Sequence, residues 1–461
     1  MSLTVVGDYT AMRKDYQEDS DASPSTLFQF FNGSDVNQQS LEARLNGGDQ
    51  ALNWTAGVYG LRIDGTYYEG WQGPAFFTAE EFDTATNPNT PLYFGIPGVW
   101  PYGTAPYFAD TNIASPAGGL PATRSPYELK ATSYAGFGQI EYRLTDRVAL
   151  TVGARLTRDK KDYHFTWYPY EYFPQSTSGN IVRLTQLAGL ALTDYANSRS
   201  DSEFTGKAQL DFHINKDLLV YAGINRGVKG GGYTAPLFPL TITDLSTLTF
   251  RPEKLTSYEV GFKSELLDHH LRLNGAAYYY DYKDYQALVY TVSLEQLIVN
   301  ADAKHTGAEL ELDWVPNEAW RFGAGLAYVD ALVKHIDARG NGILADYTPG
   351  NAPRWTANAL VRYTMPAGSG RLAFQLDGNY LSRFWFNLSD LPVVEQPAYS
   401  IANVRINYTP AGGKLEIGAS LENLADKHYG TMGFDNTSIN GLAQTYPGMP
   451  RWWKAHVNYR F

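Results

Sequence analysis

The last eleven residues, Arg451–Phe461, alternate strictly between apolar and polar side chains. Successive side chains of an extended strand point to opposite faces, so this segment has one apolar and one polar face. A soluble sheet can carry this pattern, but a strand with lipid outside and water inside requires it. The apolar face holds Trp453, Ala455, Val457, Tyr459 and Phe461, and the polar face holds Trp452, Lys454, His456, Asn458 and Arg460.

The same two-residue period recurs along the whole chain. Clear examples lie at 203–214, 257–264, 307–314, 355–363, 372–380 and 402–408. A period of two at so many places predicts an antiparallel sheet and argues against helices. We expect about sixteen strands, beginning near residues 2, 35, 51, 129, 147, 202, 217, 254, 270, 299, 318, 354, 370, 397, 413 and 451.

The connections between these strands alternate in length. Short turns are expected at 46–49, 144–147, 214–217, 266–269, 315–318, 365–370 and 409–413, and long stretches at 17–34, 67–128, 169–201, 231–253, 336–353, 387–396 and 429–450. Short periplasmic turns opposite long extracellular loops are typical of outer-membrane barrels. We therefore expect an all-β fold, a transmembrane antiparallel up-and-down β-barrel. A soluble β-sandwich that binds a ligand is the alternative fold.

Composition excludes several other classes. The 461 residues contain no apolar run near the roughly 18 residues that mark a membrane helix. A net charge of −11 argues against a nucleic-acid partner. There is no cysteine, which excludes disulfides and thiolate metal sites, and the eight histidines form no HExxH motif. We expect no enzyme activity, no cofactor and no metal site.

Several segments resemble the barrel of TonB-dependent outer-membrane receptors. In this order, over residues 35–461, they are specific for that family, although each is weak alone. The terminal Phe461 also resembles the end signal that the barrel-assembly machinery recognises. The segments are Ser133–Tyr142 with Leu150–Arg155, the glycine-rich Asn225–Tyr233, Arg251–Lys263, Gly307–Glu311, Leu421–Tyr429 and Pro447–Arg451.

The resemblance implies that residues 1–461 form only part of such a barrel domain. The family's large barrels have 22 strands and a plugged lumen, so about six strands are expected to be missing before residue 1. No plug domain and no signal peptide are found in the sequence. We expect an N-terminally truncated sequence, with a complete small barrel as the rival interpretation. The first strand would then have a free edge, and the last strand would lack its partner.

The family implies active uptake of a scarce ligand across the outer membrane of a Gram-negative bacterium. A ferric siderophore is the expected ligand; haem, cobalamin or an oligosaccharide, or passive flow through a porin-like channel, are the alternatives. The expected partners are the TonB energy-transducing complex acting through the missing plug, the barrel-assembly machinery, and outer-membrane lipid with lipopolysaccharide.

Candidate ligand-binding residues lie in or beside the expected extracellular loops. Aromatic rings suit catecholates, haem and sugars, although a girdle at the membrane interface is the simpler role for many of them. The cations could attract an anionic ferric complex, or equally contact lipopolysaccharide phosphate or an ion-pair partner in the lumen. The candidates are Trp71, Trp100, Tyr102, Arg226, Lys229, Tyr233, Arg251, Phe384 and Trp385.

Overall fold

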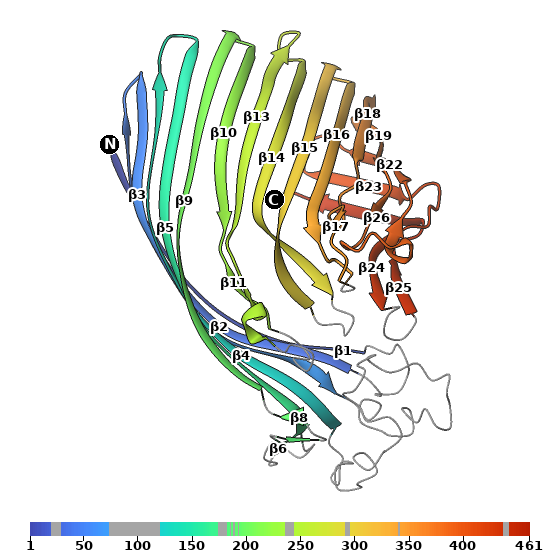
Figure 1. Ribbon diagram of the computed structural model, residues 1–461. Helices are drawn as coiled ribbons and strands as arrows, with labels where there is room; N and C mark the ends of the chain where they lie inside the picture. The colour runs from blue at the N-terminus through green and yellow to red at the C-terminus, as the bar shows by residue number, and fades with distance from the viewer. Residues whose placement is uncertain are drawn as a thin grey trace.

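The chain forms one large antiparallel sheet that curves into a wall (Figure 1). The computed structural model describes residues 1–19, 29–72, 120–173, 182–184, 186–187, 190–191, 193–235, 244–290, 296–339, 342–436 and 442–461. No helix among these residues is long and apolar enough to cross a membrane. The described chain consists almost entirely of antiparallel strands, and this confirms the all-β expectation.

The long strands follow one another in the wall in chain order, each antiparallel to the next. Of the eighteen strands in this sheet, β6 (Val182–Leu184) and β17 (Ala345–Tyr347) have three residues each, which leaves sixteen long strands in the described chain. The predicted number of strands is thus confirmed. The sixteen are β1 (Ser2–Asp19), β2 (Gln29–Gly48), β3 (Leu52–Gln72), β4 (Leu120–Arg143), β5 (Val148–Phe173), β9 (Thr193–Asn215), β10 (Leu218–Lys229), β13 (Glu253–Leu266), β14 (Leu271–Tyr290), β15 (Gln296–Asn317), β16 (Trp320–Ile336), β18 (Trp355–Ala367), β19 (Gly370–Leu381), β22 (Tyr399–Thr409), β23 (Leu415–Glu422) and β26 (Trp452–Tyr459).

Tight turns join the strands at one end of the wall, at the top of Figure 1, and long connections join them at the other end. The Asp49 side chain accepts the backbone N–H groups of Ala51 and Leu52, and Asn317 caps the turn before Trp320 in the same way. Such Asx interactions stabilise short turns. Within the described chain, β1 pairs only with β2 and β26 only with β23, so each has one unpaired edge.

The terminal strand β26 has the two faces that its sequence predicts. Trp453, Val457 and Tyr459 are 74%, 67% and 56% exposed on the outer face. On the inner face the Lys454 ammonium lies 3.3 Å from Glu422, which also pairs with Arg405. The outer face of the wall is therefore apolar near the turns, and the inner face carries ion pairs.

Several strands begin earlier on the loop side than their alternation predicts. The starts expected near 35, 129 and 202 lie instead at Gln29, Leu120 and Thr193. The outer face of these extensions is polar, because it carries residues such as Glu128 and Ser200 in place of apolar side chains. A strand with water on both faces needs no alternation of apolar and polar residues, so its sequence does not show where the strand starts.

Smaller elements lie at the loop end and position the site. The pair β11 (Gly232–Tyr233) and β12 (Thr249–Phe250) is joined through the 3-10 helix η4 (Leu245–Leu248). The hairpin β24 (Gly430–Asn436) and β25 (Leu442–Pro447) precedes β26. The remaining elements are β7 (Gln186–Leu187), β8 (Leu190–Ala191), β20 (Phe384–Trp385), the 3-10 helix η5 (Pro392–Val394) and β21 (Glu395–Gln396).

Candidate functional site

The wall divides between β9 and β10 on its loop side. β10 pairs with β9 only as far as Arg226, which lies opposite Gly206, whereas β10 continues to pair with β13 as far as Lys229. The strands diverge from there, and β11 lies in the widening space in Figure 1. Gly231 is required here, because a Cβ would lie 2.7 Å from both the Arg199 guanidinium and the Phe250 carbonyl oxygen. We call residues 230–235 the inward segment.

Five tyrosines meet on the inner face where the inward segment crosses it. The Tyr163 ring stacks on the Tyr233 ring with centroids 4.6 Å apart, and Tyr67 stacks on Tyr127 at 4.8 Å. Tyr127 and Tyr163 are 5.9 Å apart, and Tyr195 meets Tyr163 edge-on at 6.3 Å. This tyrosine cluster thus joins β3, β4, β5 and β9 to β11 through aromatic contacts.

Polar contacts hold the inward segment against β5 and β9. The Lys161 ammonium donates to the Gly231 carbonyl, and the Tyr163 hydroxyl donates to the Thr234 carbonyl at 3.2 Å. Arg199 donates to the Phe250 carbonyl and binds both carboxylate oxygens of Asp201 at 2.7 and 2.8 Å. Burial lowers the pKa of Lys161, and the hydrogen bond to Asp201 raises the pKa of Arg199. Both cations therefore have defined structural partners.

Two donors near the tyrosine cluster are buried without a hydrogen-bond partner, and the pKa of a nearby carboxyl is raised. The Trp167 indole N–H and the Tyr233 hydroxyl have no hydrogen-bond partner in the described chain. An unsatisfied buried donor costs about 1–3 kcal/mol. Glu69, beside Tyr127, has its pKa raised to about 7 by burial. Two free donors and a carboxyl near neutrality beside stacked rings can receive a ligand that has both ring and oxygen groups.

Two of the predicted cations, Lys229 and Arg251, lie beside the inward segment. The Arg251 guanidinium pairs with Asp284 at 2.6 Å, and its backbone N–H donates to Asn300 at 2.7 Å. Lys229 is exposed on the inner face and forms no ion pair with another described residue. Arg251, which directly follows β12, thus binds to β14 and β15, whereas the Lys229 ammonium is available to a ligand.

Arg226 lies on the opposite face of the wall from these residues. It alternates with Asn225, which donates to Ser257 on the inner face, and shares the outer face with Ile224, which is 43% exposed. The structure therefore separates Arg226 from Tyr233 and Lys229.

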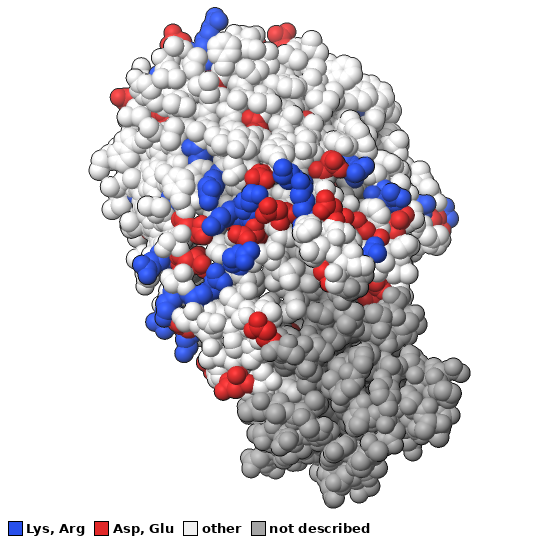
Figure 2. Space-filling view, viewed as in Figure 1, with Lys and Arg blue, Asp and Glu red and all other residues white. Residues whose placement is uncertain are grey.

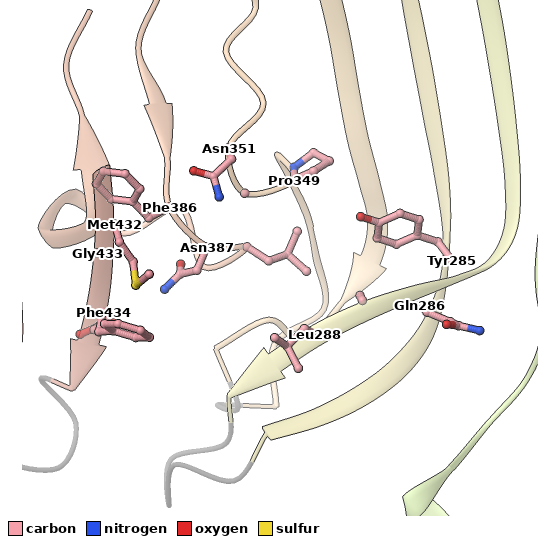
Figure 3. Close-up of a pocket in the computed structure, with 14 residues that line it drawn as sticks. Tyr285, Gln286, Leu288, Pro349, Asn351, Phe386, Asn387, Met432, Gly433 and Phe434 are labelled. Carbon is pink, nitrogen blue, oxygen red and sulfur yellow. The ribbon is translucent and has the colours of Figure 1, made fainter. Parts of the chain in front are cut away.

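A second hollow of about 330 Å³ lies between the loop ends of β14, β24 and two connections (Figure 3). Rings of Tyr285, Phe386 and Phe434 and amides of Asn351 and Asn387 line it, whereas the Gln286 amide points away and donates to the Gly230 carbonyl at 3.0 Å. The predicted Phe384 is 6% exposed and meets Phe386 edge-on at 5.4 Å, so it supports the lining from behind. The backbone carbonyl of the predicted Trp385 accepts the backbone N–H of Asn351 at 2.7 Å, and the Arg383 guanidinium lies over the Trp385 ring.

The remaining predicted aromatics cannot be placed in either site. Trp100 and Tyr102 lie outside the described residues, and Trp71 lies in β3 but its side chain is not described. Sequence reasoning missed Tyr163, Phe165 and Trp167, which are 4%, 0% and 1% exposed. These three aromatic residues alternate along β5 on its inner face, on the loop side of the segment whose outer face is apolar. That alternation was the sequence signal that could have identified them.

Comparisons with known proteins agree with this architecture. Residues 3–424 match the family model described as "TonB dependent receptor-like, beta-barrel". The fold defines the class of protein: an antiparallel barrel wall with short turns at one end and long loops at the other. This chain belongs to the TonB-dependent receptor β-barrel family, whose members are outer-membrane receptors of Gram-negative bacteria rather than enzymes.

The individual relatives are distant. The pesticin receptor of Yersinia enterocolitica is 26% identical over 342 residues, which cover 71% of this chain and 44% of the relative. The metal-pseudopaline receptor CntO of Pseudomonas aeruginosa is 23% identical over 278 residues, 59% of this chain and 35% of the relative. The ferric yersiniabactin uptake receptor FyuA of Yersinia pestis superposes with a TM-score of 0.70 at 18% identity, covering 99% of this chain and 57% of that structure. The chain thus spans less than half the length of the curated relatives.

Proposed function

We propose that this wall belongs to an outer-membrane receptor that takes up a ferric siderophore by TonB-dependent active transport. This proposal rests on the tyrosine cluster on the inner face, together with the Trp167 N–H and the Tyr233 hydroxyl, which have no hydrogen-bond partner in the described chain. Phenol rings stack on planar aryl groups, and the two donors can bind oxygens of a chelated ligand. The ring contacts provide contact area for the ligand, and the two donors fix its orientation.

The names of the relatives favour a metal chelate as the ligand. FyuA is named for ferric yersiniabactin, and CntO for a metal complex of pseudopaline. Haem, cobalamin and oligosaccharides also present flat surfaces to aromatic rings, so they are the comparison ligands in the test below. A TonB energy-transducing complex and a plug that it pulls are part of the same proposal.

The predicted residues take different parts in this proposal. Tyr233 contacts the ligand directly, Lys229 attracts its negative charge, and Arg251 holds the segment that carries them. Phe384 and Trp385 shape the second hollow, and Trp71, Trp100 and Tyr102 extend the aromatic surface toward the loops. Arg226 has no part in ligand binding, because it lies on the outer face.

Binding to the purified chain in detergent tests the ligand class. We expect tryptophan fluorescence to be quenched by ferric catecholate or phenolate siderophores at micromolar concentration or below, because Trp167 belongs to the same buried cluster as Tyr163. Haem, cobalamin and neutral oligosaccharides are titrated in parallel at the same concentrations. Tight binding of one of these three, with no response to any ferric siderophore, would contradict the proposal.

A further inference from the structure

The second hollow has aromatic rings on opposite sides. Figure 3 shows Phe386 and Phe434 on one side of it and Tyr285 on the other. The Tyr285 ring meets Tyr282 edge-on at 5.6 Å, and Tyr282 lies two residues beyond the partner of Ser257 on the inner face. The hollow is therefore on the inner side of the wall, and a ligand reaches it from solution rather than from lipid.

A bulge in β14 aims the Tyr285 ring into the hollow. The pairing of β14 with β15 shifts between Tyr282 and Tyr285, and Asp284 has a left-handed φ of 55° there. The Asp284 carboxylate binds the Arg251 guanidinium at 2.6 Å, and its backbone carbonyl accepts the Asn300 amide at 2.8 Å. Extra residues in a strand re-aim the side chains that follow them. These contacts fix the bulge and therefore the direction of the ring.

Close packing against the hairpin of β24 and β25 holds the two rings opposite. A Cβ at Gly433 would lie 2.5 Å from the Phe386 ring, and a Cβ at Gly430 would lie 3.1 Å from it, so both positions require glycine. The Phe434 ring meets Tyr446 of the same hairpin edge-on at 6.1 Å. All three rings are thus in place before a ligand binds, which lowers the entropic cost of binding.

The lining of the hollow differs in charge from the surface of the wall. Figure 2 shows Lys and Arg mixed with Asp and Glu in a band that crosses the molecule. Among the described residues, the lining contains one carboxylate, Asp435, and no lysine or arginine. Arg339 lies outside this lining, over the Tyr347 ring. Because the faces of aromatic rings are also negative, the lining as a whole attracts a cation.

We propose that the second hollow binds an alkylated organic ammonium ion that carries a hydroxyl group. The methyl groups of such an ion pack against the three rings, while the ring faces and the Asp435 carboxylate balance its charge. The Asn351 and Asn387 amides line the same hollow and bind the hydroxyl group. Asn387 Oδ1 already accepts the Ser389 N–H and hydroxyl at 3.0 and 2.6 Å, so its NH2 group donates to the ligand. This site takes a second class of ligand and does not depend on the siderophore.

The test compares choline with its uncharged isostere 3,3-dimethylbutanol, in which carbon replaces nitrogen. Each is titrated onto the full chain in a polyoxyethylene detergent, and saturation-transfer NMR of the methyl protons gives the Kd. We expect choline to bind at millimolar concentration or below, and the isostere about tenfold more weakly, because the cation–ring attraction is lost. Equal binding of the two would overturn the proposal. Tighter binding of methyl glycosides than of choline would also overturn it, because the hollow would then be a site for a neutral sugar.

Two substitutions in the lining separate charge from shape. Asp435→Asn is expected to weaken choline binding about fivefold and to leave the isostere unchanged. Phe434→Leu keeps an apolar side chain without a ring, so it is expected to weaken choline about threefold or more and the isostere less than about twofold. Heat-modifiable migration verifies that each variant is folded.

The matched control for charge is Asp281→Asn. Asp281 also lies in β14, opposite Lys304 and outside the lining of the hollow. We expect this variant to change the affinity for choline by less than about twofold, because the attraction of a distant exposed carboxylate is screened. An equal loss in Asp281→Asn and Asp435→Asn would show a general effect of net charge and would overturn the site.

Discussion

The rings of Tyr163 in β5 and Tyr233 in β11 lie parallel, with centroids 4.6 Å apart and planes within 5°. This stack fixes the inward segment on the inner face, together with the Lys161 and Tyr163 hydrogen bonds to its carbonyls. It brings a residue that the sequence singled out, Tyr233, against one that the sequence did not, Tyr163.

Replacement of Tyr233 separates the contribution of its ring from that of its hydroxyl. Tyr233→Ala is expected to weaken ferric siderophore binding at least tenfold, because it removes the stack and an unpaired donor. Tyr233→Phe keeps the ring and is expected to lose two- to tenfold. Titration by fluorescence measures both. Tyr258→Ala, on the outer face and 50% exposed, is the matched control and should bind as wild type does.

Arg199 is predicted to hold the inward segment through geometry that lysine cannot reproduce. Arg199→Lys loses the two-point contact with Asp201 and the bond to the Phe250 carbonyl. Faster amide hydrogen exchange in residues 230–235 is the expected result. Arg321→Lys is the control, because Arg321 also makes a two-point contact, with Asp313, near the turn end. Unchanged exchange in Arg199→Lys would refute this role.

Glu69 should make stability fall as the pH rises. Its pKa in the folded chain is about 7 because of burial, and the ordinary value is 4.5, so the folded state binds more protons between these values. Stability is therefore greatest below about pH 4.5 and decreases until about pH 7. Glu69→Gln is expected to gain on the order of 3 kcal/mol relative to wild type at pH 8 and little at pH 4. Urea unfolding in lipid vesicles measures this difference, and an equal gain at both pH values would contradict it.

The two faces of β26 should respond differently to the same substitution. Val457→Arg places a cation on the apolar outer face, which costs about 2–4 kcal/mol near the middle of a membrane. Asn458→Arg places it on the inner face beside Glu416, where we expect almost no loss. The fraction of heat-modifiable barrel in outer membranes measures assembly. Equal losses for both substitutions would show that the outer face of β26 does not meet lipid.

The sequence predicted the wall much better than the site. Alternation in segments such as Arg451–Phe461 follows from lipid on one face and water on the other, so it identified the strands and their short turns. The tyrosine cluster depends on the register of β3, β4 and β5 and on the divergence of β10 from β9 after Arg226. No local pattern encodes these long-range pairings. The exposed position of Arg226 was missed for a related reason, because a strand end in sequence does not show which face is the lumen.

Uptake of radioactive iron from the ferric siderophore that binds most tightly tests the central claim most directly. The receptor is expressed in a Gram-negative strain that lacks its own siderophore receptors, with or without a functional TonB complex. We predict saturable uptake that requires TonB and falls at least tenfold with Tyr233→Ala. Iron entry that is unsaturable and equal without TonB would contradict this account and identify a passive channel.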